Sequence, residues 1–454
     1  MFDRAVRALF VGCAVSIAWG IRGDFGGYVG AMYPGAMLGI AYAFATGRRS
    51  MFGWMPLLGV VSGLAIAAGG EMSYGVLHGY AKADTLVNYS YGYLMLFCQG
   101  AAWGIYGCAA IGLLLERKRL QTLDWASVFA AVYLGGFVFH WLIVDIAGFD
   151  VNPPRSNLSV AHFGGAIALF VWLVANNRRC GLRGALFGFC GFGIGMFLGR
   201  LLEMWSFQLP IPHSGNWNLN EVTVGFLGSF AFTYGMLGYD HPEPPADERK
   251  TFSFLSLFGI LFVMVGIPFR HRFRLLRPER RLEEWAKQFE KYGVADPELW
   301  PDLIVQLLNT VCLLAVIGAI VWIVIDRRRI YTMRAFPVFC LTLLMMMYQK
   351  FHSHYFWYPR DGFQLNMHDV YWVMFAVMIV SAFFCRAPCI TRADAQMAKL
   401  PWMRWAICTV AVYILVLLAA GLHVNKDGKT MGAANTRFPV WSHRDGPFPG
   451  REQN

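Results

Sequence analysis

The stretch from Lys350 to Asp369 gathers side chains capable of chemistry between two apolar runs. Histidine and carboxylate groups can bind a metal or carry a proton, and arginine can clamp an anion. Aromatic rings beside them can stack on a sugar. The polar candidates in this stretch are His352, His354, Arg360, Asp361, His368 and Asp369. The stretch is a candidate wall of a site, and we expect other polar groups of the chain to lie beside it.

The histidines of this stretch are weak candidates for metal ligands. His352 and His354 are one residue apart and His368 follows later, which is compatible with zinc but matches no strong metal motif. A hydrated loop at the membrane surface accounts for the same residues. We therefore predict no metal and no cofactor.

The composition indicates the elements that must position these groups. The 454 residues are 57% hydrophobic and only 15% charged, whereas about a quarter of the residues of a soluble domain are charged. Several runs reach the roughly 20 apolar residues that cross a bilayer. The sequence predicts an all-α polytopic integral membrane protein with the lipid bilayer as its partner. Its net charge of +11 is explained by basic cytoplasmic loops, so we expect no nucleic acid as a partner.

The apolar runs predict about 13 transmembrane helices. They fall near 5–21, 28–46, 53–73, 91–115, 126–148, 160–176, 184–204, 222–238, 252–269, 304–325, 336–349, 370–385 and 403–422. Basic residues cluster in every second loop of the first eight runs, at Arg4, Arg7, Arg48, Arg49, Arg117, Lys118, Arg119, Arg178, Arg179, Arg183, Arg249 and Lys250. The positive-inside rule then predicts a cytoplasmic N-terminus.

The chain divides into two predicted transmembrane units. Residues 1–240 form a glycine-rich unit of eight helices in four hairpins, and 241–251 form a cytoplasmic linker. A second unit of five helices covers 252–422, with an amphipathic helix on the membrane surface near 278–291. Residues 423–454 are expected to be an extracytoplasmic tail. Most of the 48 glycines precede the linker, as expected where helix backbones approach closely.

Further site candidates lie near the predicted outer ends of the four hairpins. They are Arg22, Asp24, Glu71, His78, His140, Asp145, Arg200, Glu203 and Glu221. Glu71 follows two glycines in a long apolar run, where a carboxylate is costly unless it is paired or faces water. Arg22 can pair with Asp24 or bind an anion. Each residue also has a purely structural interpretation, as a local ion pair or a hydrated helix end.

Spacing along a helix makes two specific predictions about these candidates. Arg200 and Glu203 are three residues apart, so they should share a helix face and pair. His140 and Asp145 are five residues apart, the spacing of one class of acyltransferases. In an α-helix this spacing turns the two side chains well apart, so we predict that they do not act as a pair. Lys82 is expected to be solvated.

Two functions fit this pattern. The first is a secondary transporter or permease for a small polar or anionic solute, coupled through histidine and carboxylate groups. The related stretches Ala18–Gly23 and Ala102–Gly107 favour it weakly, because transporters often contain inverted repeats. The alternative is a membrane-embedded transferase acting at the extracytoplasmic face on a lipid-linked or envelope glycan. A third interpretation is a scaffold subunit without chemistry.

The sequence leaves open whether the protein is an enzyme. It has no phosphate-binding loop and no large soluble domain, which disfavours an ATP-driven motor. The common hydrolase motifs are absent as well. We expect it in the bacterial inner (plasma) membrane, with an outward-facing polar cavity and a histidine cluster on that side. The substrate, the coupling ion and the oligomeric state remain open.

Overall fold

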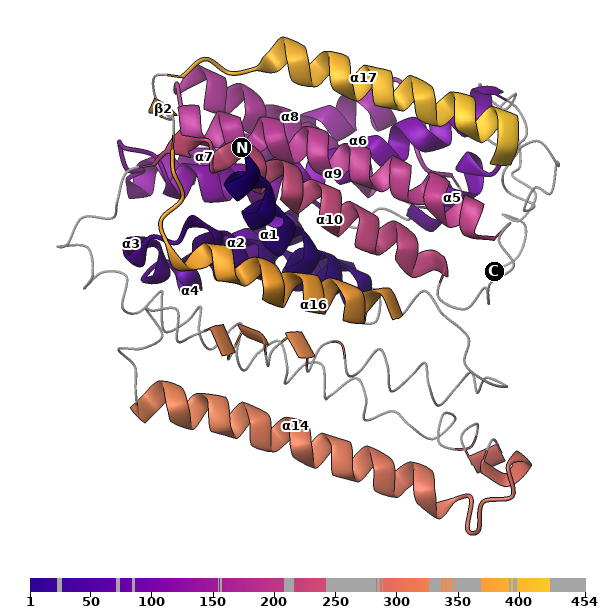
Figure 1. Ribbon diagram of the computed structural model, residues 1–454. Coiled ribbons are helices and arrows are strands. Elements are labelled where there is room, and N and C mark those ends of the chain that lie inside the picture. Colours follow the sequence, from indigo (N-terminus) through magenta and orange to yellow (C-terminus); the bar gives the residue numbers. More distant parts are fainter. Residues whose placement is uncertain are drawn as a thin grey trace.

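The computed structural model describes most of the chain. The described residues are 1–22, 27–70, 74–83, 86–153, 155, 157–207, 216–241, 283, 286–287, 289–325, 336–337, 339–340, 343–344, 347, 369–391, 393–394 and 398–424. These residues are overwhelmingly helical, with one two-stranded sheet (Figure 1).

The helices follow the predicted apolar runs wherever those runs are described. They are α1 (Phe2–Ile21), α2 (Gly27–Thr46), α3 (Arg49–Phe52), α4 (Met55–Ala68), α5 (Tyr74–Ala81), α6 (Leu86–Leu114), α7 (Thr122–His140), α8 (Leu158–Ala175), α9 (Arg179–Ser206), α10 (Asn216–Met236), α14 (Leu299–Ile325), α16 (Val370–Ala382) and α17 (Trp402–Ala419). Shorter elements are the π-helical segments η2 (Trp141–Ile146) and η8 (Ala420–Val424), the 3₁₀ segment η7 (Phe383–Arg386), and strands β1 (Tyr239–Asp240) and β2 (Ala393–Asp394).

The helices confirm an all-α membrane protein. Within the described ranges, seven helices are long and apolar enough to cross a membrane. Large apolar side chains on α7 and α17 face outward, among them Phe129, Tyr133 and Phe137 on α7 and Ile407 and Leu415 on α17. Such outward faces are stable in lipid and costly in water. The count of 13 helices and the orientation remain predictions.

Helices α6 and α9 form the centre of the bundle because their glycines let the two backbones touch. A Cβ placed on Gly104 would lie 2.1 Å from the carbonyl oxygen of Gly188, and one on Gly184 would lie 2.1 Å from that of Cys108. Gly100 approaches Phe192 in the same way. No larger residue fits at these positions without moving a helix, which is the close packing that the glycine content predicts.

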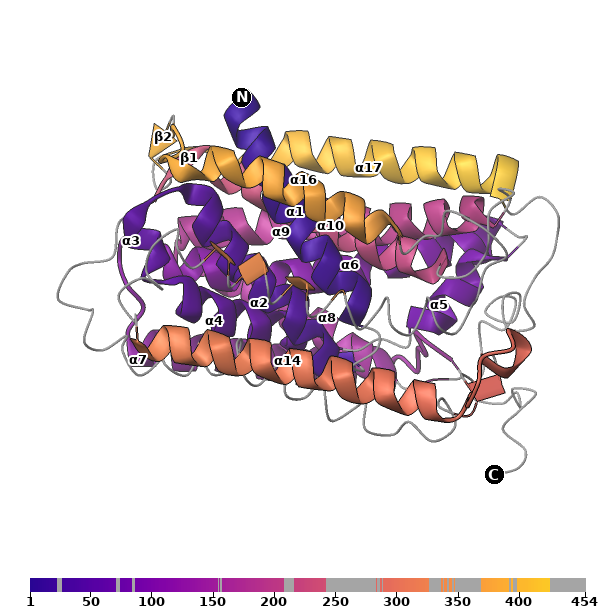
Figure 2. The same cartoon turned by 60° about the horizontal axis from the view of Figure 1, so that its bottom comes forward.

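The remaining helices surround this pair. Helix α10 packs against α9 and α1, α2 packs against α4, and α7 packs against α8. Helix α16 lies along α1, and α17 lies along α9 (Figures 1 and 2). The division into two units stays a prediction, and these two helices of the second unit pack directly on the first. The surface helix near 278–291 and the tail 423–454 lie almost entirely outside the described residues.

The bundle has two polar ends, which we name after their histidines. At the His78 end lie the C-terminal ends of α1 and α9 and the N-terminal ends of α6 and α10. At the His241 end lie the opposite ends of these helices. Contacts gather six of the predicted cytoplasmic arginines there, namely Arg4, Arg7, Arg48, Arg117, Arg178 and Arg183.

Candidate functional site

A buried ion pair on α9 forms the base of the site at the His78 end. Arg200 Nη1 lies 2.8 Å from Glu203 Oε1, and their side chains are 0% and 2% exposed. This confirms the pairing predicted from their spacing of three residues. Charges at this depth of a membrane bundle are costly unless they are paired, and they commonly mark functional sites.

His78 on α5 completes this group. Its Nδ1 atom lies 3.3 Å from Glu203 Oε2, and Arg200 Nη2 donates to the His78 carbonyl oxygen at 3.3 Å. The imidazole ring stacks on Trp217, with centroids 4.4 Å apart. Burial, reinforced by the charge of Arg200, lowers the pKa of His78 to about 4, so the ring is neutral near pH 7. We call His78, Arg200, Glu203 and Trp217 the His78 cluster.

A second ion pair lies at the same end on α1 and α10. Arg22 Nε is 3.7 Å from Glu221 Oε1, and both side chains are buried. The Arg22 guanidinium also lies 4.9 Å from the centroid of the Trp103 ring. Trp103 in turn packs edge-to-face on Trp19 at 5.2 Å, so the tryptophans of the two related stretches meet. The proposed partner Asp24 lies outside the described residues.

Several buried polar atoms around these pairs have no hydrogen-bond partner in the described part of the chain. They are the hydroxyl of Tyr93, both amide atoms of Gln99, and Oδ1 of Asn220. Tyr93, Gln99 and Asn220 are almost fully buried. Unpaired buried polar atoms are rare in folded proteins, and a polar ligand or water would satisfy them.

The sequence did not identify all of these residues. It gave no signal for Tyr93 and Gln99, which lie inside an unbroken apolar run. Lys82, predicted to be solvated, is instead partly buried. Burial and the nearby Arg200 charge lower the pKa of Lys82. Because Lys82 directly follows the short helix α5, the local sequence pattern did not indicate this burial.

The prediction that His140 and Asp145 point apart is wrong. His140 Nδ1 lies 3.5 Å from Asp145 Oδ2. The chain is π-helical from Trp141 to Ile146, and the i→i+5 hydrogen bonding of a π-helix brings residues five apart onto one face. The pair is partly exposed, on a helix whose described contacts are mainly with α8, so it is separate from the buried His78 cluster.

The wall proposed from Lys350 to Asp369 is described only at its end. Asp369 precedes α16 and is half-buried. The other candidates outside the described residues are Asp24, Glu71, His352, His354, Arg360, Asp361 and His368. Their place in the site therefore remains a prediction.

Comparisons with known proteins add no family to this picture. No protein-family model matches the chain, and neither a curated protein nor a solved structure is significantly similar to it. The fold and the site define the class as an all-α integral membrane protein with a buried charged group at one end. Any functional conclusion must come from the chemistry of that group.

Proposed function

We propose that the protein is a secondary transporter for a small polar or anionic solute. The observation that supports this most is the burial of Arg200, Glu203 and His78 inside the helix bundle. Their side chains are at most 3% exposed, as expected of a site reached through a pathway within the bundle. A cluster serving only surface chemistry would lie open to lipid or solvent.

The geometry suggests how solute and proton binding are coupled. Arg200 is neutralised by Glu203 at 2.8 Å, so an anionic solute must displace this carboxylate to bind the guanidinium. Protonation of Glu203 removes the competing charge and frees Arg200. The neutral His78 ring, 3.3 Å from the carboxylate, is placed to relay that proton, giving one from Nδ1 while Nε2 takes another. Proton and anion then bind together, which is the basis of symport.

The arginine distribution supports an orientation of the protein in the membrane. The arginines gathered at the His241 end favour a cytoplasmic location for that end under the positive-inside rule. The His78 cluster then faces the extracytoplasmic side. Within the described part of the chain, the polar atoms of Tyr93, Gln99 and Asn220 that have no hydrogen-bond partner suit a solute that carries hydroxyl or amide groups beside its anionic group.

Proton flux in proteoliposomes tests this proposal. The purified protein is reconstituted with a pH-sensitive dye inside, and inorganic phosphate, succinate and gluconate are added outside in turn. We expect one of these anion classes to acidify the interior, and Glu203→Gln to abolish the response. The proposal fails if none of the three anions moves protons, or if Glu203→Gln responds like the wild type.

The exposed His140–Asp145 pair favours a second candidate function, a transferase acting on a lipid-linked or envelope glycan. Asp145 at 3.5 Å can orient His140 as a general base for an acceptor hydroxyl arriving from the lipid side. Membranes enriched in the protein should then transfer a radiolabelled sugar from a polyprenyl-phosphate donor. His140→Gln should abolish that transfer, and equal transfer by the variant and the wild type would exclude this role.

A further inference from the structure

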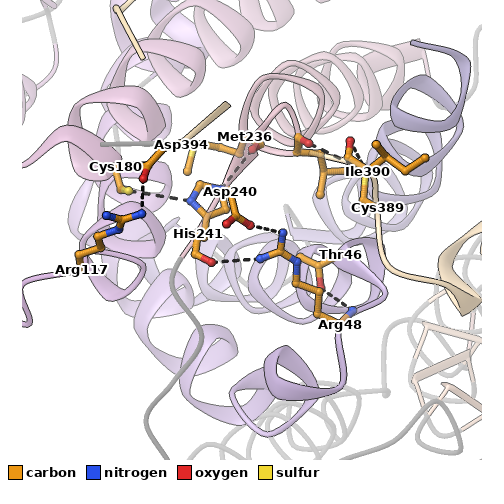
Figure 3. Close-up of polar contacts among 11 residues, drawn as sticks. Thr46, Arg48, Arg117, Cys180, Met236, Asp240, His241, Cys389, Ile390 and Asp394 are labelled. Atoms are coloured by element: carbon orange, nitrogen blue, oxygen red, sulfur yellow. Dashed lines mark hydrogen bonds and ion pairs between the residues drawn. The ribbon is translucent and has the colours of Figure 1, made fainter. Parts of the chain in front are cut away.

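The His241 end is joined by polar contacts between segments far apart in the chain (Figure 3). We propose that strands β1 and β2, with Arg48 and Arg117, form a latch that holds this end closed and opens during transport. The inference rests on the proposed transport function. It extends that function by naming the closed end and the contacts that must break.

The latch is built from reciprocal contacts. Strand β1 pairs in parallel with β2, with Tyr239 opposite Ala393 and Asp240 opposite Asp394. Each strand aspartate is then held by an arginine from another helix connection. Arg48 Nη2 lies 2.5 Å from Asp240 Oδ1, and Arg117 forms an ion pair with Asp394. The sheet therefore joins the connections after α2, α6, α10 and α16.

His241 fills the space behind the strands. Its Nε2 atom lies 3.1 Å from the carbonyl oxygen of Met236. Since a carbonyl only accepts, Nε2 carries the proton and Nδ1 faces Cys180 Sγ at 3.9 Å. Arg48 Nη1 donates to the His241 carbonyl oxygen at 3.0 Å. Cys180 is fully buried behind this ring, so the closed latch shields its thiol.

The segment between α16 and α17 completes the closure. The Cys389 amide donates to the Thr46 carbonyl oxygen at 2.9 Å, and Arg183 donates to the carbonyl of Ala398. Arg183 also lies 4.3 Å from the centroid of the Tyr239 ring. Opening this end requires residues 387–391, 393–394 and 398–400 to move away from α2 and α9 together.

The two ends of the bundle differ in how costly they are to open. Asp240 is 55% exposed and Arg117 is 58% exposed in their ion pairs. Exposed pairs contribute little to stability, and each strand of the sheet has only two residues. The ion pairs of the His78 end are instead almost fully buried. Weak, solvent-accessible contacts are suited to repeated breaking and reforming.

Alkylation of Cys180 measures opening directly. The purified full chain in detergent is treated with N-ethylmaleimide, and modification of tryptic peptide 180–183 is followed by mass spectrometry. Asp394→Asn removes the charge that pairs with Arg117, and we expect labelling to accelerate about two- to fivefold, the effect of losing one exposed ion pair. The control is Asp124→Asn, whose aspartate is equally exposed and pairs with Arg178 at the same end, outside the latch.

A cross-link tests the same motion in the opposite direction. Tyr239→Cys with Ala393→Cys places two thiols at paired strand positions, a separation that a disulfide can bridge. Oxidation should slow Cys180 labelling below the wild-type rate, and reduction should restore it. This measurement holds even if Asp394→Asn does not fold.

The outcomes separate the latch from transport. Equal acceleration by Asp394→Asn and Asp124→Asn would overturn the latch, as would unchanged labelling after cross-linking. Transport that persists in the oxidised double-cysteine protein would also overturn it. Labelling that follows the expected pattern in a protein that moves no solute would instead refute the transport function, while still showing that these contacts hold the His241 end closed.

Discussion

Replacing Glu203 by glutamine tests whether this carboxylate stabilises the buried charge of Arg200. Arg200 is fully buried, with Glu203 at 2.8 Å, so the variant leaves a buried guanidinium without a counter-charge. Breaking a buried ion pair from one side costs about 3–5 kcal/mol of unfolding free energy. We expect Glu203→Gln to lose stability in that range.

Removing the partner as well should recover most of this loss. In Arg200→Met/Glu203→Gln neither member of this pair carries a charge, and replacing both members of a buried pair is often neutral or stabilising. Asp145→Asn is the control, because it breaks the partly exposed His140–Asp145 pair. Such a pair is worth about 0–1 kcal/mol.

Equilibrium unfolding in mixed detergent micelles, followed by tryptophan fluorescence, supplies the three free energies. A loss for Glu203→Gln no larger than that for Asp145→Asn would contradict an unpaired buried charge as its cause. A double variant less stable than Glu203→Gln would contradict it as well, since the cost would then not arise from an unpaired charge.

Three further predictions address the pH response, the packing and the second site. Burial lowers the pKa of His78 to about 4, so the unfolded chain binds this proton first as the pH falls. The free energy of unfolding should stay constant above about pH 6.5 and fall by up to about 3 kcal/mol toward pH 4. The free energy of unfolding of His78→Gln, measured over the same pH range, should fall less. Gly104→Ala should cost about 1–3 kcal/mol of unfolding free energy, because its Cβ would lie 2.1 Å from the Gly188 carbonyl oxygen. Gly75→Ala is the control: this glycine has open space around it, so the melting temperature should be unchanged or slightly higher. His140→Gln should leave solute-driven proton flux at the wild-type level, and a large loss of flux would place that exposed pair in the transport pathway.

The sequence predicted the elements well because apolar length and helix spacing are local properties. Helices α1, α6 and α9 follow predicted apolar runs. Arg200 and Glu203 pair as their spacing requires. The abundance of glycine correctly indicated close helix packing. Only the structure shows that α6 and α9 are packed in this way.

The composition of the site could not be predicted in the same way. His78 and Glu203 come together across 125 residues, and Arg22 meets Glu221 on the neighbouring helix α10. Such contacts depend on how helices pack, which no spacing rule gives. His140 and Asp145 were misjudged because an α-helical rotation was assumed where the chain is π-helical.

Solute-driven proton flux through Arg200→Met/Glu203→Gln shows whether the buried pair is a transport site. This variant should regain stability because it contains no unpaired buried charge, so a loss of flux cannot be attributed to misfolding. The His78 cluster as a transport site predicts a folded protein that moves neither solute nor protons. Flux at the wild-type level would show that the buried pair is structural and would contradict its role in transport.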